Sequence, residues 1–120
     1  MKISSNIDEN AKVIKEILPV QKSFDVILRE IIVDNKKAYL LFIDGFVKDT
    51  IMVHVMKELQ KVNDDKKDTA RKVMLQNIPY IEASVENDLN KVIDEVLSGQ
   101  VALLIDGDTT AVLVDTREYP

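Results

Sequence analysis

The 120-residue chain has the length of one domain and can bury a compact core without a metal ion or a disulfide. Its composition, 46% hydrophobic and 31% charged residues with few Gly and Pro, excludes a disordered or fibrous protein. The formal net charge of -5, without a basic stripe, excludes nucleic acid as an expected partner.

The sequence also contains no cysteine, which excludes disulfides, thiolate metal sites and thiol nucleophiles. Its longest apolar runs, such as residues 38–43, are far shorter than the roughly 20 residues that a membrane-spanning helix needs. The first residues lack the features of a secretory signal. We therefore expect one soluble domain over residues 1–120, with mobile ends at 1–5 and 118–120.

The first predicted element is a helix at about residues 7–17. Asn6 and Glu9 have the spacing of a capping box, in which both side chains bond to backbone amides of the first turn. Apolar residues then recur at helical spacing until Pro19, and the residue before a proline resists the helical conformation.

Two strands follow, at residues 24–33 and 38–43. The first is rich in β-branched residues, and the second is an uninterrupted apolar run. The polar cluster at 34–37 is typical of a turn, so the strands are expected to form an antiparallel hairpin.

The middle of the chain predicts three helices, because the hydrophobic period changes to that of a helix after Asp44-Gly45. They are expected at about 49–61, at about 70–78 ending before Pro79, and at about 86–97. For the third helix, Ser84 or Asn87 is the candidate cap, and Gly99 lies beyond its end.

Two further apolar runs, at 101–105 and 111–114, predict a second hairpin. Both runs lack alternation, which is typical of central strands buried on both faces. The expected fold class is α/β, with helices packed on a four-stranded mixed sheet in the order α-β-β-α-α-α-β-β.

Few residues suggest catalysis. The only histidine, His54, falls beside the apolar arc of its predicted helix, and no second His or Cys is present to complete a zinc site. None of the serines lies in a nucleophile-elbow motif. We therefore expect neither a metal nor another cofactor.

The apolar run before Asp44-Gly45 is echoed by the run before Asp106-Gly107, and both end in Ile-Asp-Gly. Two carboxylates at strand ends could serve acid/base chemistry or bind Mg²⁺. Asp-Gly is also a common turn dipeptide, since Asp bonds to the following backbone and Gly accepts a positive φ. The simpler interpretation is therefore two turns.

Three stretches carry recognisable motifs. Residues 24–30, Phe-Asp-Val-Ile-Leu-Arg-Glu, are a predicted strand that ends in Arg-Glu. Residues 39–47 contain an apolar strand that ends in Ile-Asp-Gly, and residues 98–117 contain Gly, a strand, Asp-Gly, a second strand and Asp-Thr-Arg. Taken together and in this order, the three stretches resemble the N-terminal soluble domain of the A subunit of spore germinant receptors, the GerA family. Residues 118–120 depart from it, since Glu-Tyr-Pro stands where the family more often has Gly-Trp-Pro.

The resemblance implies that the chain is an N-terminal fragment of a longer membrane protein. Family A subunits continue into a membrane domain and assemble with B and C subunits in the inner membrane of the dormant spore. The complex responds to nutrients such as amino acids or sugars and triggers germination. For this fragment, the cytoplasmic (core) side of that membrane is favoured.

Three functions are therefore considered. The leading hypothesis is a non-enzymatic domain for receptor assembly and signal transduction, with the other subunits and the rest of the A subunit as partners. The alternative is a domain that binds a small ligand, the germinant, at strand ends or towards a missing second subdomain. Its weak candidates are four charged residues: Arg29, Asp44, Asp106 and Arg117. A hydrolase or phosphotransfer domain that uses one of the two Asp-Gly carboxylates is the third.

Overall fold

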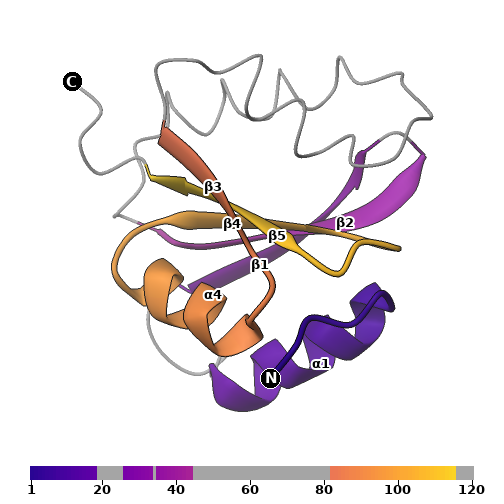
Figure 1. Cartoon of the computed structure of the whole chain (residues 1–120), viewed down its shortest axis with the longest axis horizontal. Coiled ribbons are helices and arrows are strands. Elements are labelled where there is room, and N and C mark those ends of the chain that lie inside the picture. Colours follow the sequence, from indigo (N-terminus) through magenta and orange to yellow (C-terminus); the bar gives the residue numbers. More distant parts are fainter. Residues whose placement is uncertain (19–25, 34, 45–81, 116–120) are drawn as a thin grey trace.

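The computed structural model describes residues 1–18, 26–33, 35–44 and 82–115, in which two helices cover one face of an antiparallel sheet (Figure 1). The α/β class is therefore confirmed. In chain order the elements are α1 (Ile7–Ile17), β1 (Val26–Val33), β2 (Lys36–Ile43), β3 (Glu82–Glu86), α4 (Leu89–Leu97), β4 (Val101–Ile105) and β5 (Ala111–Asp115). The helices predicted at 49–61 and 70–78 lie outside the described residues.

The sheet has five strands in the order β1-β2-β4-β5-β3, and every neighbouring pair is antiparallel. The prediction of a four-stranded mixed sheet was wrong on both counts. The additional strand is β3, which lies in a segment where no strand was predicted and where Ser84 was a candidate helix cap. Its five residues pair with the whole of β5, from Glu82↔Asp115 to Glu86↔Ala111, so its conformation depends on partners that lie 33 to 25 positions away in the sequence.

Helix α1 has the predicted limits, and its first turn is capped through an additional residue. The Asn6 side chain accepts a hydrogen bond from the amide of Asp8 at 3.0 Å. The Glu9 carboxylate accepts from the Ser4 hydroxyl at 2.8 Å, and the Ser4 oxygen accepts from the Asn6 amide at 3.0 Å. The capping box is thus closed through Ser4, rather than by Glu9 directly.

Helix α4 begins three residues later than predicted, because β3 continues as far as Glu86. The residue that caps it is Asp88, whose side chain accepts from the amide of Asn90 at 3.0 Å. Ser98 is the C-cap, and Gly99 follows it with a φ of 112°, a conformation that favours glycine at a helix end. Among the described helices, none is long and apolar enough to cross a membrane.

The two hairpins set the register of the sheet. The first runs without interruption from Val26↔Ile43 to Val33↔Lys36, and Asn35 turns the chain with a φ of 63°. In the second, β4 and β5 are joined by a turn in which Gly107 has a φ of 93°. As predicted, β4 and β5 are central strands, and nearly all of their residues are buried.

The main core lies between the sheet and the two helices (Figure 1). Burial of an aliphatic side chain of this kind contributes about 1.5–3 kcal/mol, so this layer supplies much of the driving force for folding. The opposite face of the central strands is also buried, at Leu40, Leu103 and Val112. The core between sheet and helices contains Ile7, Ile14, Tyr39, Leu41, Leu89, Val92, Val96, Ala102, Leu104 and Leu113 among others.

Candidate functional site

The aspartates of the two Ile-Asp-Gly motifs, Asp44 and Asp106, lie at opposite ends of the sheet. Strands β2 and β4 are antiparallel, so the residues that directly follow the two strands lie at opposite ends of the sheet. The amide of Asp106 donates to the carbonyl of Lys37 at 2.9 Å, which aligns Asp106 with the start of β2. Asp44 directly follows β2 and is seven residues after Lys37, which places it about 23 Å from Lys37 at the usual rise per residue of a strand. The two carboxylates therefore do not form one site.

Asp106 has a structural partner at the start of α1. Its carboxylate oxygen Oδ1 accepts a hydrogen bond from the backbone amide of Ile7 at 3.1 Å, and the amide of Gly107 donates to the carbonyl of Ser5 at 2.8 Å. Amides in the first turn of a helix have no partner within the helix, and a carboxylate there is also favoured by the helix dipole. Asp106 thus joins the β4–β5 turn to α1.

Arg29 lies on the strand β1 and on the face of the sheet opposite α1. It is exposed, and its guanidinium carbon is 5.9 Å from the centre of the Phe42 ring on β2. This geometry is that of a cation–π contact, which orients the guanidinium without neutralising its charge. Asp44 is exposed as well, and Arg117 lies outside the described residues. Because Arg29 lies on the face opposite α1 and Asp106 contacts α1, the two residues are not brought together.

A group of charges that the sequence did not indicate lies on the other face, where Lys37 connects β2 to α1. Its ammonium group is 2.7 Å from the Asp8 carboxylate and 3.7 Å from that of Glu30. Tyr39 Oη donates to the same Glu30 oxygen at 3.5 Å. The hydrogen bond to Asp8, with the attraction of Asp8 and Glu30, raises the pKa of Lys37. The signal available in the sequence was only a lysine in a turn, since the pairing depends on the packing of α1.

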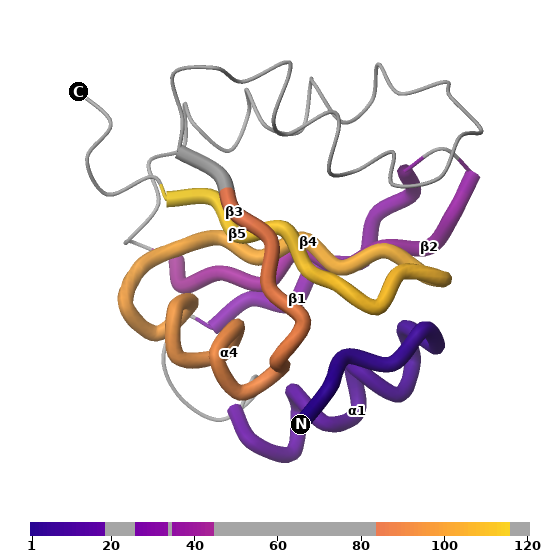
Figure 2. The backbone as a smooth tube through the Cα atoms, viewed as in Figure 1, coloured from indigo at the N-terminus to yellow at the C-terminus, as the bar shows by residue number. Residues whose placement is uncertain are grey.

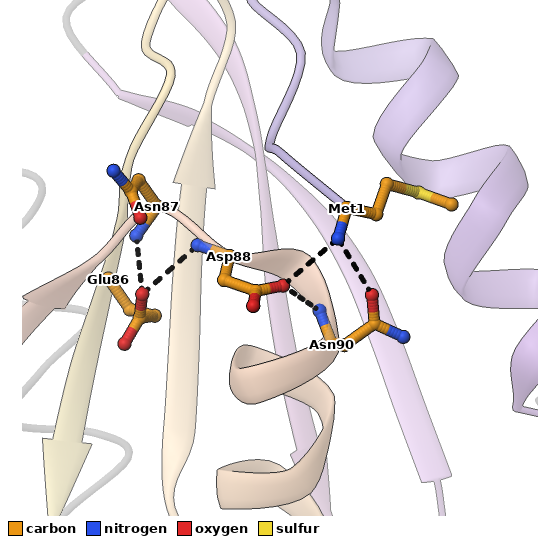
Figure 3. A network of polar contacts seen from close by, with 5 residues as sticks. All are labelled: Met1, Glu86, Asn87, Asp88 and Asn90. Carbon is orange, nitrogen blue, oxygen red and sulfur yellow. Dashed lines mark hydrogen bonds and ion pairs between the residues drawn. The ribbon is translucent and has the colours of Figure 1, made fainter.

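The second polar group missed from the sequence surrounds the start of α4 (Figure 3). The N-terminal ammonium group of Met1 is 3.3 Å from Asp88 Oδ1 and 3.1 Å from Asn90 Oδ1. Glu86 Oε2 accepts from the amides of Asn87 at 3.0 Å and Asp88 at 3.1 Å. The backbone bond from Asn90, with the attraction of the ammonium group, lowers the pKa of Asp88.

The first five residues therefore form a connection between the two helices, which Figure 2 traces from the start of α4 to the start of α1. The amide of Leu89 donates to the carbonyl of Met1 at 2.8 Å, and the amide of Ile3 donates to the carbonyl of Asn87 at 3.0 Å. The contact between Ser5 and Gly107 holds the other end of the segment. These contacts are structural, because each uses backbone groups that would otherwise lack a partner.

No metal site is evident in the part of the chain that the structure describes, since no three His, Cys, Asp or Glu side chains come together there. His54 lies outside the described residues, so its predicted surface position stays a prediction. What the described charges do is link elements: Asp106 to α1, Lys37 to α1 and β1, and Asp88 to the N-terminal segment.

Comparisons with known proteins give one family match. The model of a family described as Bacillus/Clostridium GerA spore germination protein matches residues 12–120. Stage V sporulation protein AF of Bacillus subtilis (strain 168) is 29% identical over 122 residues, which cover 100% of this chain and 25% of the relative. This chain therefore spans about a quarter of that protein.

A solved structure has a similar fold. The crystal structure of the N-terminal domain of the A subunit of the Bacillus megaterium spore germinant receptor GerK3 matches with a TM-score of 0.79 and 23% identity. The match covers 97% of this chain and 48% of the solved chain, so this chain spans about half of that domain. At this identity, the likeness shows a common fold.

Proposed function

Because the chain belongs to the Bacillus/Clostridium GerA spore germination protein family, we propose that it is part of the N-terminal domain of a spore germinant receptor A subunit and serves receptor assembly and signal transduction. The observation that carries this proposal is the family match over residues 12–120. The fold shared with the N-terminal domain of a receptor A subunit supports the same position in a larger protein.

The roles of the charged residues favour an assembly function over catalysis. A hydrolase or phosphotransfer site built on the two Asp-Gly corners would need their carboxylates to act on one reacting group. Asp106 instead caps α1, and Asp44 lies at the other end of the sheet. Lys37 is engaged with Asp8 and Glu30. These charges hold elements together, so we propose a non-enzymatic domain.

The proposed partners are the B and C subunits of the receptor and the rest of the A subunit. The proposed location is the inner membrane of the spore, reached through a part of the protein beyond this chain, with the domain on the cytoplasmic (core) side. A domain with this role binds its partners through exposed residues. On the described surface, the exposed positions include Lys15 on α1, Ile32 on β1 and Asp94 on α4.

Site-specific photocrosslinking in spores tests this role. A photoreactive amino acid is placed singly at Lys15, Ile32 or Asp94 in the full-length protein, and the products are identified by mass spectrometry. We expect at least one position to crosslink to another receptor subunit. A photoreactive residue at buried Val92 is the matched control, because it contacts only the protein's own core. Crosslinks confined to the protein's own chain at all three positions would contradict the proposal.

The alternative, binding of a nutrient or another small ligand, now concerns single residues rather than the set of four. Asp44 and Asp106 are too far apart for one small ligand, whereas Arg29 is exposed and its guanidinium lies over the Phe42 ring. A thermal-shift screen with amino acids, sugars and nucleosides tests this alternative. A ligand present at a hundred times its dissociation constant stabilises a protein by about 2.7 kcal/mol.

A further inference from the structure

Within the described residues, strand β1 lies at an edge of the sheet and has little of the usual protection against pairing. Among the described strands it pairs only with β2. It is eight residues long, it pairs in an uninterrupted register without a bulge, and it contains no proline. Edge strands are commonly shortened, bulged, interrupted by proline or covered with charge, because an open edge pairs with other strands. Here only Arg29 and Glu30 interrupt the apolar residues.

These two charges lie on the two faces of the sheet, and each contacts a side chain of β2. Arg29 lies over the ring of Phe42 on one face. Glu30 lies directly across from Tyr39 on the other face and accepts a hydrogen bond from its hydroxyl. The Glu30 side chain is 55% exposed, and Lys37 is closer to Asp8 than to Glu30. Ile32, two residues further along the same face, is 62% exposed.

We propose that the outer edge of β1 binds an extended segment of another polypeptide, which adds to the sheet as an antiparallel sixth strand. Main-chain hydrogen bonds would hold the segment, and side chains directly opposite each other would select it. The two charges of β1 specify what is selected: a basic residue opposite Glu30, followed directly by an acidic residue opposite Arg29. Apolar or β-branched residues would flank this pair and cover Ile32.

A second copy of this chain fits the edge less well. The backbone groups of alternate residues point to opposite edges of a strand, so an edge that pairs with itself in the antiparallel sense sets only residues of equal parity opposite each other. Arg29 can then meet Arg29 of the second copy, or Glu30 can meet Glu30, but Arg29 never meets Glu30. The remaining registers place both charges opposite apolar residues. Charge complementarity therefore favours a different segment.

This inference rests on the proposed assembly role and identifies one surface that would serve it. Two labelled eight-residue peptides of equal composition test it with the 120-residue chain. The matching peptide is Thr-Thr-Val-Lys-Glu-Val-Thr-Val, and the exchanged peptide carries Glu-Lys in place of Lys-Glu. In the matching peptide, Lys faces Glu30 and Glu faces Arg29. In the exchanged peptide, Glu faces Glu30 and Lys faces Arg29, so both pairs have like charges. We expect the matching peptide to bind about tenfold more tightly in fluorescence anisotropy.

A charge exchange in the protein makes the test specific for this edge. The double variant Arg29→Glu with Glu30→Arg is expected to reverse the preference between the two peptides. The double variant Lys91→Asp with Asp94→Lys, which exchanges two exposed charges on α4, is the matched control and keeps the original preference. Amide NMR shifts on binding are expected in residues 26–33 and not in β3.

Three outcomes would overturn the inference: neither peptide binds, both bind equally, or the preference is the same in the double variant at 29 and 30. None of them bears on the receptor role itself, because crosslinks from Lys15 or Asp94 to another receptor subunit would still be observed. Conversely, a charge-dependent preference without any crosslink in spores would support the edge and contradict the receptor role.

Discussion

The carboxylate of Asp106 accepts a hydrogen bond from the backbone amide of Ile7 at 3.1 Å, although 99 positions separate the two residues. This contact joins the turn between the central strands β4 and β5 to the first turn of α1. The adjacent bond between the Gly107 amide and the Ser5 carbonyl reinforces it. The second Ile-Asp-Gly corner thus ends a strand and caps a helix.

Replacing Asp106 with alanine is therefore expected to destabilise the domain by about 0.5–2 kcal/mol, the usual effect of losing a capping side chain. The substitution Asp106→Asn keeps an oxygen that can accept from the Ile7 amide, so it should retain most of the stability. Urea unfolding followed by circular dichroism gives the free energy of unfolding for each variant.

Asp44→Ala is the matched control, because it removes the corresponding carboxylate of the other Ile-Asp-Gly corner. Asp44 is exposed, so we expect a change within about 0.5 kcal/mol. Equal effects of the substitutions at 44 and 106 would show that the contact with Ile7 contributes nothing to stability.

Local signals in the sequence were sufficient for α1 but not for β3. Helix α1 has a capping residue at Asn6, an apolar stripe and a proline after its end, all within 14 residues. Strand β3 is Glu-Ala-Ser-Val-Glu, which is short and has charges at both ends. Its strand conformation depends on pairing with β5, and such a pairing is not encoded within the five residues themselves.

The candidate site illustrates the same limit. The sequence correctly placed Asp44 and Asp106 at strand ends, but whether they meet depends on the order and direction of the strands. Because β2 and β4 are antiparallel neighbours, the two residues lie at opposite ends of the sheet. The pairing of Lys37 with Asp8 was equally inaccessible, since it depends on where α1 packs.

Two leucines on α4 provide a direct test of the core. Leu89 is 1% exposed and belongs to the core between the sheet and the helices, whereas Leu97 is 47% exposed. We expect Leu89→Ala to cost about 2–5 kcal/mol, which includes the cavity that the substitution leaves. Leu97→Ala should cost less than about 1 kcal/mol, because most of the removed side chain already contacts water. Similar unfolding free energies for the two variants would contradict the packing described for α4.

The lowered pKa of Asp88 predicts a loss of stability in acid. A carboxyl group whose pKa is lower in the folded state stabilises the fold above its unfolded pKa, and this contribution is lost as the pH falls through the folded pKa. The decrease should therefore begin near the pKa of an ordinary aspartate, about 3.9, and continue below it.

The variant Asp88→Asn isolates this effect, because asparagine is as good a helix cap as aspartate but carries no charge. We expect the wild type to exceed the variant in unfolding free energy at neutral pH, and the difference to shrink as the pH falls below about 4. The measurement is a series of urea titrations across this range. A difference that does not change with pH would show that the charge on Asp88 has no net effect on folding.

The turn between β1 and β2 requires a residue that accepts a left-handed conformation. Asn35 has a φ of 63°, a conformation that costs most residues with a side chain roughly 1–2 kcal/mol and costs glycine least. Asn35→Gly should therefore be close to neutral in unfolding free energy, while Asn35→Ala should lose about 1 kcal/mol. Asn35 is exposed, so loss of packing does not complicate the comparison.

Because the turn sets the register of the hairpin, amide NMR shifts of the two strands report whether the pairing of Val33 with Lys36 is kept. An alanine variant as stable as the glycine variant, with the same register, would show that the left-handed conformation does not limit this turn.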